Sequence, residues 1–112
     1  DMSYLLVGLG AAVGASLRFA ISQWRGAPVG TLIVNLIGSF LLGCFSSLSL
    51  SGSQLALLGA GLCGGLTTFS AFAVQANEVG ATNVRQGQVY VAVTIIGSLL
   101  ACLVGFQLFA NV

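Results

Sequence analysis

The chain has 112 residues, of which 57% are hydrophobic and only 4% are charged, and its mean hydropathy is +1.07. A soluble domain carries about 25% charged residues, so in water this composition would expose large apolar patches. The net charge of +1 gives no electrostatic basis for binding nucleic acid. We therefore expect a membrane protein whose surroundings are a lipid bilayer, with no nucleic-acid partner.

The few charged residues divide the chain into long apolar runs. They are Asp1, Arg18, Arg25, Glu78 and Arg85. A membrane-spanning helix needs about 20 apolar residues, so the uncharged stretch between Arg25 and Glu78 holds two spans and a turn. One domain over residues 1–112 is predicted, with four transmembrane helices at about 4–22, 30–50, 55–80 and 88–109.

The connections between these spans are short. Pro28 suits the start of the second helix, because its missing N–H costs nothing there, and the polar residues 51–54 predict a tight turn before the third. No basic region precedes the first span, so we expect it to be retained rather than cleaved as a signal peptide. The apolar runs lack the alternation of a membrane β-barrel. An all-α membrane protein is therefore the predicted fold class.

Small residues are frequent inside the predicted spans. Gly10 with Gly14, and Gly61 with Gly65, form GxxxG pairs that let helix backbones approach closely. The cysteines fall inside spans at spacings that fit no metal motif, and we interpret Cys44, Cys63 and Cys102 as packing residues. Because four thin helices enclose little polar interior, we expect an oligomer.

The third span carries an unusual run, Gly64-Gly65-Leu66-Thr67-Thr68. Glycine and threonine are weak helix formers, so the run predicts a helix broken in mid-membrane. Non-helical backbone at that depth must be buried in protein or face a water-filled cavity, and its free carbonyls can hold a cation. A merely kinked packing helix is the alternative.

Uncharged polar and aromatic residues near this run predict an anion pathway. Phe69 and Phe72 share a helix face, and their positive ring edges suit an anion. Asn35, with Thr31 one turn before it, is either an interhelical hydrogen-bonding residue or an N–H donor for an anion. A hydroxyl stripe recurs every four residues along the fourth span, formed by Tyr90, Thr94 and Ser98.

Three motifs in order make the chain resemble the Fluc fluoride channels, also called the CrcB family, from end to end. They are Gly10-x3-Gly14-x3-Arg18-Phe19, Gly30-Thr31-x3-Asn35-x2-Gly38-Ser39-Phe40-x2-Gly43 and Cys63-Gly64-Gly65-Leu66-Thr67-Thr68-Phe69-Ser70-x-Phe72. The resemblance implies an antiparallel, dual-topology dimer with two fluoride pores, which exports fluoride across the bacterial inner (plasma) membrane and is not an enzyme.

The resemblance also implies roles for individual residues. It implies a structural sodium ion at the dimer centre, held by the backbone carbonyls of Gly64 and Thr67, and it places Arg18 at an aqueous vestibule. The fluoride pathway would comprise Asn35, Phe69, Phe72, Ser70, Thr94, Ser98, Tyr90 and Thr31. Two positions depart from the family pattern, since Ala73 stands where a serine is frequent and Gln75 where a glutamate is frequent.

Other interpretations stay open at this stage. The arginines gather at one membrane face, which favours one orientation, so the chain is either a homodimer subunit or one subunit of a heterodimeric fluoride channel. A small four-helix, proton-coupled multidrug transporter is an alternative, but it needs a membrane-embedded carboxylate, and Glu78 lies at a span end. A structural membrane subunit gives no reason for Asn35 and the broken helix to occur together.

Overall fold

The computed structural model describes residues 2–110, and all regular structure in that range is helical. Asp1, one of the charged residues considered above, lies outside the described range, as do residues 111–112. The elements are α1 (Met2–Arg25), α2 (Val29–Ser47), α3 (Gly52–Gln54), η1 (Leu55–Cys63), α4 (Gly64–Leu66), α5 (Phe69–Thr82) and α6 (Val84–Phe109). The predicted all-α fold class is confirmed.

Four helical stretches are long and apolar enough to cross a membrane: Met2–Arg25, Val29–Ser47, Gly52–Thr82 and Val84–Phe109. At 1.5 Å per residue, the 24 residues of α1 extend about 36 Å, against about 30 Å of hydrocarbon. The third stretch combines α3, η1, α4 and α5. The four predicted helical spans are therefore confirmed, with the first, third and fourth longer than predicted and the second shorter.

The connection between the second and third spans differs from the prediction. Helix α2 ends at Ser47 rather than at residue 50, and the turn predicted at 51–54 is wrong, because Gly52–Gln54 is already helical. Ser51 accepts the Gln54 N–H at 3.2 Å while its own N–H donates to the Gln54 side chain at 3.0 Å. This capping box satisfies two free N–H groups at the helix start, so the polar residues begin the helix.

The first half of the third span is a π-helix, η1, a feature that the sequence pattern does not predict. Together with α4, it packs against α1 through the two glycine pairs. A Cβ added to Gly10 or Gly14 would collide with the η1 backbone, and one on Gly65 would collide with the Ala11 backbone. The predicted close approach of helix backbones is confirmed.

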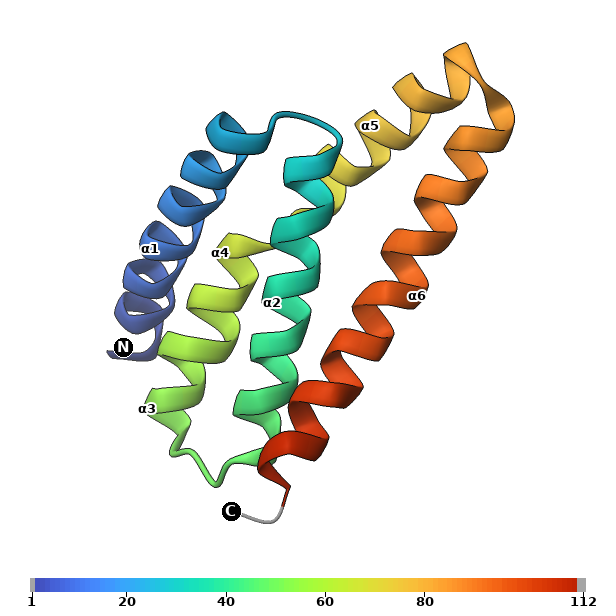
Figure 1. Ribbon diagram of the computed structural model, residues 1–112. Coiled ribbons are helices and arrows are strands. Elements are labelled where there is room, and N and C mark those ends of the chain that lie inside the picture. Colours follow the sequence, from blue (N-terminus) through green and yellow to red (C-terminus); the bar gives the residue numbers. More distant parts are fainter. Residues whose placement is uncertain (1, 111–112) are drawn as a thin grey trace.

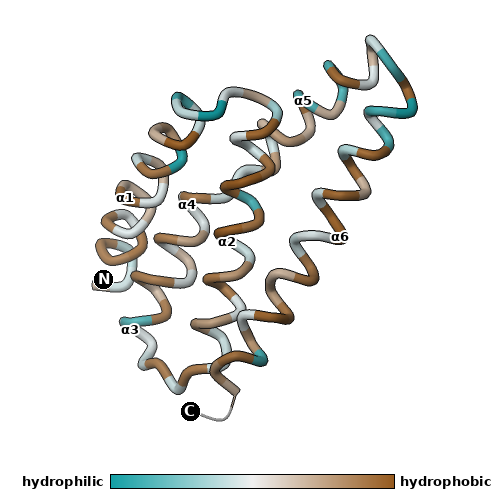
Figure 2. Tube along the Cα trace, in the orientation of Figure 1, coloured by the Kyte–Doolittle hydropathy of each residue, from teal (hydrophilic) through white to brown (hydrophobic). Residues whose placement is uncertain are grey.

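The remaining helices complete an elongated bundle of 46 × 30 × 22 Å. Helix α6 packs along α2, and α5 leads away from the bundle to form a hairpin with α6 (Figure 1). Hydrophilic residues gather at the α1–α2 connection and the α5–α6 hairpin, while the helices between are mainly hydrophobic (Figure 2). Arg25 and Arg85 lie at that polar end, as predicted, and the Arg25 guanidinium lies 5.1 Å from the centre of the Trp24 ring.

Candidate functional site: a neutral groove beside the broken helix

The third span is broken at Thr67 and Thr68, as the sequence predicted. Thr67 has φ −82° and ψ 160°, and Thr68 has φ −151° and ψ 120°, so both are extended between α4 and α5. The Thr67 hydroxyl donates to the Cys63 carbonyl at 3.0 Å, and the Thr68 hydroxyl accepts the Ala71 N–H at 3.2 Å. Threonine side chains thus close both helix ends at the break.

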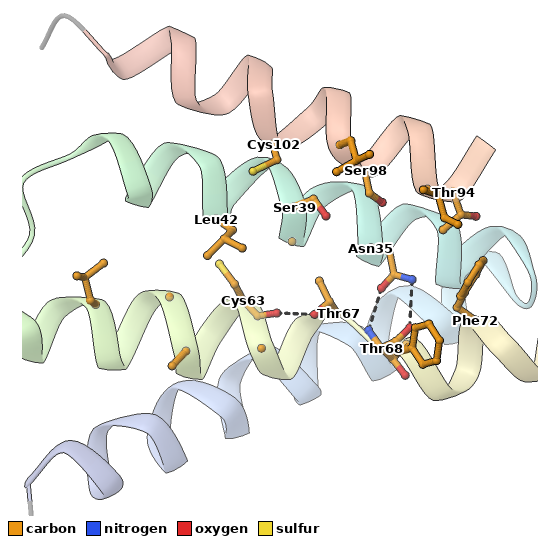
Figure 3. Close-up of a pocket in the computed structure, with 18 residues that line it drawn as sticks. Asn35, Ser39, Leu42, Cys63, Thr67, Thr68, Phe72, Thr94, Ser98 and Cys102 are labelled. Atoms are coloured by element: carbon orange, nitrogen blue, oxygen red, sulfur yellow. Dashed lines mark hydrogen bonds between the residues drawn. The ribbon is translucent and has the colours of Figure 1, made fainter. Parts of the chain in front are cut away.

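Asn35 of α2 is paired with the broken backbone. Its Oδ1 accepts the Thr68 N–H at 2.8 Å, and its Nδ2 donates to the Thr68 carbonyl at 3.1 Å (Figure 3). Asn35 is only 8% exposed, so these bonds satisfy two backbone polar groups of Thr68 that would otherwise be unpaired in an apolar interior. The interhelical hydrogen bond considered from the sequence is therefore present, and one of the two Nδ2 hydrogens remains for another partner.

The hydrogen bonds from side chains to the break also leave two backbone carbonyls without their usual N–H partners. In a continuous α-helix the Gly64 carbonyl accepts the Thr68 N–H, and the Thr67 carbonyl accepts the Ala71 N–H. Here both N–H groups donate to side-chain oxygens instead. Gly64 is exposed and Thr67 partly exposed, so these carbonyls are chemically suited to a hard cation such as sodium.

The broken helix borders an open groove of about 870 Å³ between η1, α2, α5 and α6. Exposed residues such as Phe69 and Leu99 line it, so it opens on the surface of the chain. No charged side chain lines it. Its polar lining comes from amide and hydroxyl groups, on Asn35, Ser39, Thr67, Thr68, Thr94 and Ser98.

The hydroxyl stripe of α6 faces this groove in part. Thr94 and Ser98 line it, and Ser39, one turn after Asn35 on α2, lines it from the other helix (Figure 3). Thr94 is 4% exposed, and its hydroxyl makes no hydrogen bond of good geometry within residues 2–110. From the sequence, Ser39 was assigned no place in the pathway, although its i+4 spacing from Asn35 puts both residues on one helix face.

Three aromatic rings form a continuous row beside the groove. The centres of the Phe69 and Phe72 rings lie 5.9 Å apart with planes tilted by 57°, and the Phe72 and Tyr90 centres lie 5.7 Å apart. Phe72 is 8% exposed, whereas Phe69 is 80% exposed. The two phenylalanines share a helix face, as predicted, but within a single chain Phe72 is buried and Phe69 is not.

The Tyr90 hydroxyl links the row to two other elements through long contacts. It lies 3.5 Å from the Pro28 carbonyl and 3.4 Å from the Gln75 Oε1, beyond the 2.7–2.8 Å usual for O–H···O bonds. Gln75 was noted from the sequence as a departure from the family pattern and was not assigned to the pathway. Its position beside Tyr90 adds a neutral amide to this end of the row.

Three predicted pathway residues do not line the groove, namely Thr31, Ser70 and Tyr90, and neither does the predicted vestibule residue Arg18. Thr31 is buried in α2, and Ser70 is exposed, with its Oγ 3.3 Å from the Thr68 Oγ1. Arg18 is half-buried on α1, one turn after Gly14 and on the same face of the helix. Glu78 is exposed on α5 and does not line the groove.

The chain is similar in sequence to one family of proteins over nearly its whole length. The family described as "CrcB-like protein, Camphor Resistance (CrcB)" matches residues 5–106. Fluoride-specific ion channel FluC 2 of Rhodococcus jostii is 43% identical, over 96% of this chain and 98% of its own length. FluC 1 of Listeria monocytogenes is 40% identical, over 96% and 97%, and FluC of Chlorobium phaeobacteroides is 39% identical, over 93% and 90%.

Proposed function

Because the chain belongs to the CrcB-like family, we propose that it is a fluoride channel, a multi-pass protein of the bacterial plasma membrane that passively exports cytoplasmic fluoride. The observation that carries this proposal is the groove itself. Uncharged donors and aromatic rings line it at membrane depth, beside a helix broken between two apolar segments.

The chemistry of the lining favours a small anion. A conducting site must replace the hydration shell of the ion and still release the ion. Thr94, Ser98 and the remaining N–H of Asn35 supply neutral donors, and phenyl edges supply weak positive potential. A charged lining residue would hold a halide too tightly for rapid passage, and none lines the groove.

The groove of one chain is open on one side, and we propose that a second copy closes it. Phe69 lines the groove and is exposed, and in such a pair it would reach across to the pathway of the partner. An antiparallel pair of identical chains would have two equivalent pathways, each built from both subunits. A heterodimer with an oppositely oriented relative would have the same arrangement.

The family resemblance further implies a sodium ion between the subunits, and the carbonyls of Gly64 and Thr67 are suited to hold it. They lack their helical N–H partners, and Gly64 is exposed. Two copies of this pair would supply four oxygen ligands. The ion would fix the two broken helices against each other.

A liposome assay tests the channel. Purified protein in vesicles loaded with potassium fluoride should release fluoride when valinomycin carries potassium, as measured with a fluoride electrode. Phe69→Ile should slow release strongly, whereas Phe19→Ile, at an exposed phenylalanine of α1 outside the groove, should not. Release of chloride at a similar rate, or no fluoride release, would contradict the proposal.

A further inference from the structure

The paired amide of Asn35 has a consequence for the cation site rather than for the anion pathway alone. Helix α2 contacts the break at two points one turn apart. Asn35 binds both backbone groups of Thr68, and Gly38 leaves the space that the Thr67 methyl fills, since a Cβ there would collide with that methyl. The break is therefore held in register by a neighbouring helix.

The Gly64 and Thr67 carbonyls lack N–H partners as long as these contacts keep the helix broken. If the Asn35 side chain did not take the Thr68 N–H, that N–H would be available to the Gly64 carbonyl, its partner in an α-helix. The Thr68 hydroxyl caps the Ala71 N–H and so stabilises the extended backbone at Thr67 and Thr68. If that backbone became helical, the Ala71 N–H would return to the Thr67 carbonyl. Each diverted N–H thus corresponds to one freed oxygen.

We propose that Asn35 and Thr68 are positioning residues for the cation site, acting as substitute acceptors that keep the Gly64 and Thr67 carbonyls free for sodium. The inference rests on the sodium site of the proposed function. It also links the pore to the ion, because the Asn35 amide that lines the groove is the group that holds the cation-binding backbone open. Linkage requires the reverse effect, so bound sodium must stabilise the Asn35–Thr68 pair.

The test measures sodium affinity by thermal denaturation of the purified protein. The denaturation midpoint is followed against sodium chloride, with ionic strength held constant by N-methylglucamine chloride. The wild-type midpoint should rise and saturate. Asn35→Leu and Thr68→Val should each raise the half-saturating sodium concentration by about tenfold or more, as loss of ligand-orienting groups does at metal sites.

Ser98→Ala is the matched control, because Ser98 lines the groove but has no hydrogen bond to the break. It should keep the wild-type half-saturating concentration even if fluoride release changes. A wild-type sodium response in Asn35→Leu would overturn the inference. No sodium response in the wild type would remove the cation site itself, while fluoride release from the same preparation would show that the channel proposal still stands.

A second measurement needs no variant and therefore does not depend on a variant folding. Amide hydrogen exchange of the wild type should slow at Thr68 and Ala71 by about tenfold or more in saturating sodium, by the same linkage. The amide of Leu62, within η1, serves as a reference outside the break. Equal exchange rates at Thr68 with and without sodium would overturn the inference.

Discussion

Thr94→Val separates a hydroxyl that stabilises the fold from one kept for an ion. Valine has nearly the same shape as threonine but cannot donate a hydrogen bond. Thr94 is buried on α6, and its hydroxyl lacks a well-formed partner within the described chain. A buried polar group without a partner costs about 1–3 kcal/mol, so the variant should be as stable as the wild type or more stable by up to that amount.

Fluoride release through the Thr94→Val protein should, by contrast, become slower. A hydrogen bond to a charged partner is worth about 1.5–3 kcal/mol, which corresponds to about a 10- to 150-fold slower passage if the ion loses this donor at its barrier. Stability is measured by reversible denaturation in mixed micelles, and release with a fluoride electrode. Thr82→Val is the control, because its hydroxyl bonds to the Val79 carbonyl at 2.9 Å at the end of α5. A destabilised Thr94→Val protein with unchanged release would refute this reasoning.

Two other substitutions test the fold that holds the groove. Gly14→Ala should destabilise the protein by about 1–3 kcal/mol, because a Cβ there collides with the η1 backbone. Gly8→Ala, with nothing within 4 Å of its Cβ, should instead gain up to about 1 kcal/mol of helix propensity. Equal denaturation midpoints for the two variants would contradict the packing. Ser51→Ala should cost about 1 kcal/mol by removing the cap with fluoride release unchanged, whereas Ser53→Ala should cost less; equal losses would argue against the capping box.

The spans and the break were predictable because they depend on local composition. Runs of apolar residues bounded by charges define the four spans, and weak helix formers at Thr67 and Thr68 define the break. The turn at 51–54 was assigned wrongly because serine and glutamine suit both a turn and a capping box. The two are distinguished by whether the Gln54 side chain folds back onto Ser51, which composition does not determine.

The partners of the polar groups were not predictable from the sequence. Asn35 was equally consistent with a structural bond and with an ion contact, because helix periodicity gives the face of a residue but not the depth of the facing backbone. The π-helical turns of η1 alter the register of the third span, so which of its residues meets Asn35 depends on tertiary packing. Gln75 escaped assignment for the same reason, since its contact with Tyr90 joins residues on different helices.

Under the proposed function, the distribution of hydrogen bonds gives a reason why a path for an anion needs no charged residue. Asn35, Thr67 and Thr68 use their side chains mainly on the backbone of the break, so these groups are already oriented before an ion arrives. Preorganised dipoles in an apolar site interact more strongly with an ion than dipoles that must first reorient. The Thr94 hydroxyl is left without such a role. A lining in which most polar atoms are committed to the fold and few are free would bind a small anion at few points, which favours release as well as entry.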